Sequence, residues 1–67
     1  MIYKLYVEVE NRLHLVAEDD YLSNLQNIMI HNETDIRNKY GLGLINWVIF
    51  KNNLLLFECT RYMGVEI

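Results

Sequence analysis

The chain has 67 residues, of which 52% are hydrophobic, and it carries a formal net charge of −3 at pH 7. A chain this apolar can bury enough surface to offset the entropy lost on folding, which excludes disorder, and no apolar run approaches the roughly 20 residues of a membrane-spanning helix. We therefore expect one soluble domain over residues 1–67, small enough that its stability depends on good packing or on a partner.

The cysteine and the charges indicate the setting in which the protein works. Cys59 is the only cysteine and cannot form an internal disulfide, so we expect a reducing, cytoplasmic environment. The six Lys and Arg residues are scattered along the chain, whereas acidic residues cluster near its start. Because nucleic-acid sites normally carry a basic patch, these charges disfavour a nucleic-acid partner.

The first two predicted elements are strands that form a hairpin. Residues 1–10 alternate apolar and polar side chains, which predicts a half-buried strand, and residues 13–17 alternate in the same way. The side chains expected inward on the second strand are Leu13, Leu15 and Ala17. A two-residue turn at residues 11–12 would turn the wrong face inward, so we expect a three-residue loop over residues 10–12 that pairs Val9 with Leu13.

The third predicted element is a helix over about residues 19–40, because the apolar spacing changes to that of one helix face. Its apolar stripe consists of Tyr21, Leu22, Leu25, Ile28, Met29, Ile36 and Tyr40. The acidic residues 18–20 suit the cap and first turn of a helix, and Gly41 is a natural stop. The polar residues 31–34 form a weak point, where the helix could bend or break.

The last two predicted elements are strands within residues 45–59, joined by a two-residue turn at Asn52 and Asn53. Regular pairing from this turn puts Trp47 opposite Glu58 on one face and Val48 opposite Phe57 on the other. We assign the face of Val48, Phe50, Leu55 and Phe57 to the core, because the alternative would bury the Glu58 carboxylate without a partner. The predicted fold is α+β with element order ββαββ, a four-stranded sheet with one helix packed on one face.

The opposite face of this sheet would then be apolar and uncovered, which is typical of a protein interface. The predicted partner-binding residues are Tyr6, Glu8, Glu10, Ile45, Trp47, Ile49, Leu54 and Leu56. We expect Trp47 to be the anchor, since tryptophan is enriched among interface hot spots. Three alternatives remain open: a homodimer, a different partner protein, and a chain whose residues 62–67 cover Trp47 or whose strand register differs by one residue.

No pattern in the sequence predicts catalysis, a metal or a cofactor. His14, His31 and Cys59 are the only soft or borderline metal ligands, and their spacing matches no zinc motif. The Gly-x-Gly at residues 41–43 follows a helix instead of preceding one, so it suits a helix stop and not a phosphate loop. We expect no enzymatic activity, no metal, no cofactor and no membrane association.

The sequence thus predicts a small non-enzymatic interaction protein. Its short length, with many Asn, Ile and Tyr residues, favours an accessory protein of a virus or mobile element that dimerises, or that binds and inhibits a larger host protein. A second hypothesis is nucleic-acid binding through the sheet aromatics Tyr6, Trp47 and Tyr62. A third is that an acidic patch occupies a basic groove in place of nucleic acid. That patch would combine Glu18, Asp19 and Asp20 with Glu8 and Glu10.

Overall fold

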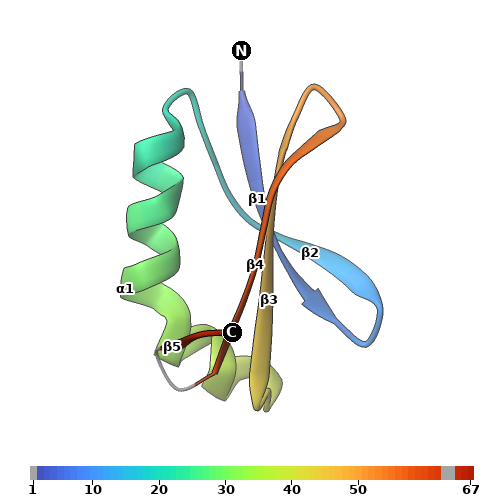
Figure 1. Ribbon diagram of the computed structural model, residues 1–67, viewed down its shortest axis with the longest axis vertical. Coiled ribbons are helices and arrows are strands. Elements are labelled where there is room, and N and C mark those ends of the chain that lie inside the picture. Colours follow the sequence, from blue (N-terminus) through green and yellow to red (C-terminus); the bar gives the residue numbers. More distant parts are fainter. Residues whose placement is uncertain (1, 63–64) are drawn as a thin grey trace.

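The computed structural model describes residues 2–62 and 65–67, in which one helix lies along one face of a sheet (Figure 1). The elements are β1 (Tyr3–Val9), β2 (Arg12–Asp19), α1 (Leu22–Tyr40), β3 (Leu44–Lys51), β4 (Leu54–Tyr62) and β5 (Val65–Glu66). The strand order across the sheet is β2-β1-β3-β4-β5, and every neighbouring pair is antiparallel. The α+β class is therefore confirmed, but the prediction of four strands was wrong, because the short β5 adds a fifth strand and the order is ββαβββ.

The helix α1 begins later than predicted but is continuous. Asp19 is the last residue of β2, and its Oδ1 accepts hydrogen bonds from the Tyr21 backbone N–H at 2.8 Å and from Asn24 Nδ2 at 3.0 Å. The first turn of α1 contains no acidic residue, so the expected first-turn acids instead form the turn that leads into the helix. Gly41 ends the helix in the left-handed conformation, at φ 66°, as the sequence predicted.

The hydrophobic core lies between α1 and the face of the sheet that the helix covers. Its buried residues are Leu5 and Val7 of β1, Leu25 and Met29 of α1, Ile45, Trp47 and Ile49 of β3, and Cys59 of β4. The alternation of β1 and the apolar stripe of α1 correctly predicted which side chains of these two elements are buried in the core. The side chains of β3 that fill it, however, are those that the sequence assigned to the opposite face.

A β-bulge at Leu56 explains this reversal. The turn residues Asn52 and Asn53 adopt positive φ values of 51° and 64°, and Lys51 pairs with Leu54 as predicted. The register then shifts by one residue, so that Trp47 lies opposite Cys59 and Glu58 moves to the other face. The outer placement of Ile45, Trp47 and Ile49 was therefore wrong, and the one-residue register difference left open above is the arrangement found.

The first hairpin differs from its prediction for a similar reason. Glu10 and Asn11 form a two-residue turn with φ values of 53° and 65°, and Val9 pairs with Arg12 instead of Leu13. A second bulge, at Val16, returns Ala17 to the core side, opposite Leu5. The three-residue loop and the inward placement of Leu13 and Leu15 were therefore wrong, because the turn puts these two leucines on the face away from α1.

Among the described residues, the Glu33 carboxylate is buried on the helix-covered side of the sheet. Glu33 of α1 is 6% exposed, and its Oε2 accepts a hydrogen bond from Arg37 Nη2 at 3.4 Å. Its Oε1 accepts a hydrogen bond from Arg61 Nε, and this interaction raises the pKa of Arg61 above its ordinary value. The paired charges join the second half of α1 to β4 on the side of the sheet that the helix covers.

Candidate interaction surface

The sheet face away from α1 can be built from the strand register. Side chains alternate between the two faces, so the neighbours of the buried Leu5, Val7 and Trp47 point away from the helix. They cross the sheet in three rows: Glu18, Lys4, Phe50 and Leu55; Leu15, Tyr6, Val48 and Glu58; and Leu13, Glu8, Asn46 and Thr60. We call these residues the outer face.

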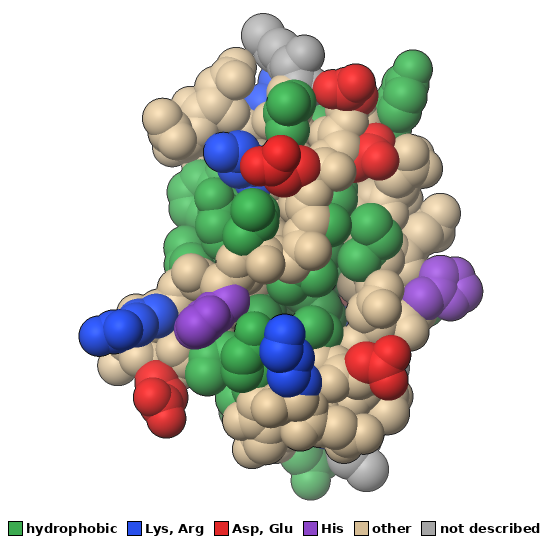
Figure 2. Space-filling view, turned by 180° about the vertical axis from the view of Figure 1, so that it is seen from behind, with side chains coloured by type: hydrophobic (Ala, Val, Ile, Leu, Met, Phe, Trp, Pro, Cys, Tyr) green, Lys and Arg blue, Asp and Glu red, His purple; other side chains and the backbone are tan. Residues whose placement is uncertain are grey.

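Apolar side chains contribute much of the outer face. Leu13, Leu15 and Leu55 are 46%, 52% and 51% exposed. Between them the rings of Tyr6 and Phe50 meet edge to face, with centroids 5.6 Å apart and planes at 89°. Figure 2 shows hydrophobic side chains gathered on the side of the molecule opposite α1. The outer face thus presents large apolar side chains to its surroundings.

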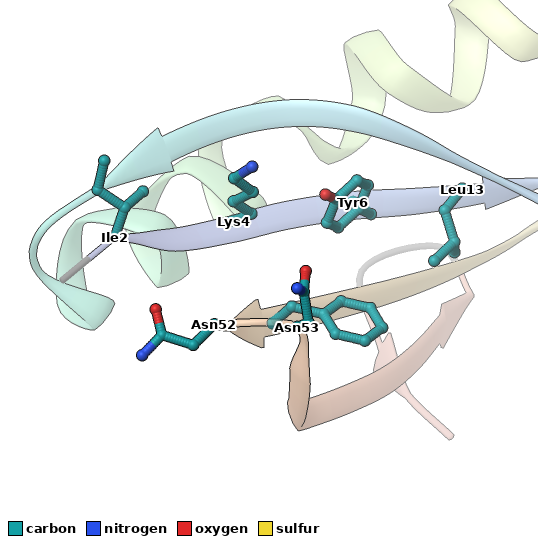
Figure 3. A pocket seen from close by; sticks show the side chains of 7 residues that line it. Ile2, Lys4, Tyr6, Leu13, Asn52 and Asn53 are labelled. Atoms are coloured by element: carbon teal, nitrogen blue, oxygen red, sulfur yellow. The ribbon is translucent and has the colours of Figure 1, made fainter.

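A groove of about 350 Å³ lies on the outer face along β1 (Figure 3). It is lined by Ile2, Lys4, Tyr6, Leu13, Phe50, Asn52 and Asn53. In Figure 3 the side chains of β1 lie along one side of it and those of the β3–β4 turn along the other. Its volume is at the lower end of the range for ligand pockets, and it suits an apolar group with polar atoms at its margin.

Asn46 joins two carboxylates beside this apolar region. Its Nδ2 donates hydrogen bonds to Glu8 Oε2 at 3.2 Å and to Glu58 Oε2 at 3.3 Å, and its Oδ1 accepts one from Thr60 Oγ1 at 3.2 Å. At the other end of the outer face Lys4 Nζ lies 3.7 Å from Glu18 Oε1, and both side chains are nearly half exposed. An exposed pair at this distance contributes little to stability.

The predicted partner-binding residues are divided between surface and core. Tyr6 and Glu8 lie on the outer face, Leu54 and Leu56 are 65% and 46% exposed in β4, and Glu10 is exposed in the β1–β2 turn. Ile45, Trp47 and Ile49 have no exposed surface and cannot contact a partner of the folded chain. The sequence interpretation missed Leu13, Leu15, Asn46, Phe50, Leu55 and Glu58. Their alternation was visible, but the turn at Glu10 and Asn11 that places the β2 leucines and the bulge in β4 that places the others were not.

The acidic residues do not form one patch. Glu18, Asp19 and Asp20 lie together around a shallow hollow at the start of α1, which Ile2, Tyr21 and Asn24 also line. Glu10 lies in the turn at the opposite end of the β1–β2 hairpin, because Asp19 pairs with Tyr3 at the far end of β1. The strand between them spans roughly 20 Å, so Glu18, Asp19 and Asp20 lie together but do not form one patch with Glu10, as the third hypothesis required.

Cys59 is buried in the hydrophobic core. It is 6% exposed, and its thiol donates a hydrogen bond to Glu66 Oε1 at 3.2 Å. Burial, and then the Glu66 hydrogen bond, raise the pKa of the Cys59 thiol above 9.0. A thiol with a raised pKa is a poor nucleophile at neutral pH, because the thiolate is the reactive form.

Within residues 2–62 and 65–67, no group of three or more His, Cys, Asp and Glu side chains is placed to hold a metal ion. The His14 ring packs against the Tyr40 ring, with centroids 5.3 Å apart, and His31 is exposed on α1. No helix in the described part of the chain is long and apolar enough to cross a membrane. Comparison with protein-family models, curated proteins and solved structures found no match to the chain.

Proposed function

We propose that this protein acts by binding another protein through its outer face. The observation that carries the proposal is the exposure of Leu13, Leu15 and Leu55 on the sheet face that α1 leaves uncovered. Each is about half exposed, so covering it completely would contribute on the order of 1 kcal/mol before the costs of association. Exposed large apolar side chains gathered on one sheet face of a small chain are the usual mark of an interaction surface.

The strand edges favour contact through side chains over strand addition. Both β2 and β4 contain a bulge, and bulges in edge strands hinder pairing with a further strand. Along the edge of β4 away from β3, the described residues of β5 pair with Arg61 and Tyr62, and the Ile67 N–H donates to the Thr60 carbonyl. A partner that packs on the outer face avoids both irregular edges and reaches the exposed leucines directly.

In this proposal the protein is a non-enzymatic accessory protein of a virus or mobile element, and it inhibits a larger host protein in the cytoplasm. Its short chain and single cysteine support this setting. Trp47, which the nucleic-acid hypothesis used as a stacking platform, is fully buried, and this weakens that hypothesis. The outer face retains one exposed ammonium group, Lys4, against three carboxylates, which is a poor surface for phosphate groups.

Site-specific photo-crosslinking in the cells that produce the protein tests the proposal. We expect a photoreactive residue at Leu15 to give a discrete higher-mass adduct, because a bound partner lies over this side chain. The same residue at Gln26, which is exposed on α1, is the matched control and should give none. Adducts of equal yield from both positions, or adducts from Gln26 alone, would mean that the outer face is not the binding surface.

A further inference from the structure

The charges on the outer face indicate what its partner must carry. Glu8 and Glu58 lie beside the apolar side chains, and both accept hydrogen bonds from Asn46 Nδ2. The amide therefore holds the two carboxylates close together, within reach of a single cation. At the other end of the face Lys4 is already paired with Glu18. The unmatched charge of the outer face is thus negative, like the net charge of −3 of the whole chain.

This charge disfavours a second copy of the chain as the partner. Two outer faces packed together would bring Glu8 and Glu58 of both copies into one interface. Each copy has only Lys4 on that face to offset them. Like charges brought together oppose association, whereas a positively charged partner would be attracted to the face and guided to it.

The position of the groove also predicts how far apart the apolar group and the positive charge of the partner must lie. Tyr6 lines the groove, and Glu8 follows two residues later on the same face of β1. Two residues of an extended strand span about 7 Å, so an apolar group beside Tyr6 and a cation at Glu8 are separated by about that distance. Alternate residues of an extended partner segment have the same separation.

We propose, on the basis of the function proposed above, that the outer face binds a basic and apolar segment of a different protein. An Arg or Lys of that segment contacts the carboxylates of Glu8 and Glu58. An aliphatic or aromatic side chain two positions away enters the groove beside Tyr6. Arginine fits best, because its planar guanidinium group can donate to two carboxylates at once.

Selection of short random peptides displayed on phage against the immobilised protein tests this inference. We expect enriched peptides to carry Arg or Lys two positions from an aliphatic or aromatic residue. Synthetic copies should bind the Glu8→Gln, Glu58→Gln double variant at least about tenfold more weakly than wild type in calorimetric titration. The matched control is Asp20→Asn with Asp35→Asn, which removes the same charge from exposed positions off the outer face and should leave the affinity unchanged.

Other results would overturn the inference in distinguishable ways. Enriched peptides without basic residues, or equal affinity for the Glu8→Gln, Glu58→Gln variant, would exclude a basic partner. If Leu15→Ser still weakened the binding of those peptides, the outer face would remain the interaction surface. A wild-type dimer that Leu15→Ser dissociates would make the partner a second copy. Failure to enrich any peptide would remove the basic segment as the occupant of the groove.

Discussion

At the scale of single residues, Trp47 is the position where the structure changes the expected behaviour most. Its side chain is fully buried between α1 and the sheet, together with Ile45 and Ile49. A tryptophan on the outer face would have been a candidate anchor for a partner, and its removal would have left the fold intact. In the core it contributes to folding, and its truncation leaves a cavity.

We predict that Trp47→Ala lowers the free energy of unfolding by about 3–5 kcal/mol, which is most of the stability of so small a domain. The measurement is urea unfolding followed by circular dichroism. Leu15→Ser is the control, and because Leu15 is half exposed its change should stay below about 1 kcal/mol. A Trp47→Ala variant as stable as wild type would contradict the packing of β3 against α1.

The buried thiol of Cys59 predicts a dependence of stability on pH. Its pKa is raised above 9.0 in the folded chain, so at higher pH the folded state holds a proton that the unfolded state has released. The contribution of the protonated thiol to the free energy of unfolding should therefore be complete below about pH 9. It should be lost as the pH rises through the pKa of Cys59 in the folded state. Other groups titrate in this range, so the readout is a slope compared between variants.

Unfolding in urea at several pH values between about 8 and 10.5 measures that slope, near the ordinary thiol pKa. The Cys59→Ala variant should lose stability less steeply than wild type over this range, whatever its absolute stability. Parallel slopes for the two proteins would show that the Cys59 thiol does not retain its proton on folding.

At the scale of elements, the turn at Glu10 and Asn11 and the bulge in β4 determine which side chains form the outer face. The extra residue in β4 is Leu56, and the pairs on either side of it are Phe50 with Leu55 and Ile49 with Phe57. Deleting Leu56 would remove the bulge and leave those pairs unchanged. Glu58 would still lie opposite Val48. The strand β4 would then be regular, and its edge would carry the exposed apolar side chains of Leu54 and Leu55.

We therefore predict that the variant lacking Leu56 folds with the same core but associates through its β4 edge. A regular, apolar and partly unpaired edge strand is a site for pairing between chains. Light scattering over a dilution series should detect larger species for this variant than for wild type, and circular dichroism should show retained structure. An unfolded variant, or one no more associated than wild type, would show that the bulge does not protect this edge.

At the scale of the whole molecule, much of the fold followed from short stretches of sequence. The α+β class, the helix ended by Gly41 and the Asn52–Asn53 turn each depend on residues close together in the chain, and all three are confirmed. The outer face could be predicted only in part. Tyr6 and Glu8 were placed correctly because β1 has no extra residue of its own. The β2 leucines were misplaced because the turn at Glu10 and Asn11 is one residue shorter than predicted, and the β3 side chains were misplaced because of the bulge in β4.

Sequence patterns alone located β1 to β4 and the helix, and showed that each of these strands has two sets of side chains, one for each face of the sheet. Which set of β3 faces α1 depends instead on how the strands and the helix pack together. A bulge leaves the alternation of each strand nearly unchanged, yet it reverses the faces of all residues beyond it relative to the neighbouring strand. The choice depends on the free energy of packing Trp47 under the helix while Glu58 stays outside, and that involves residues distant in the chain.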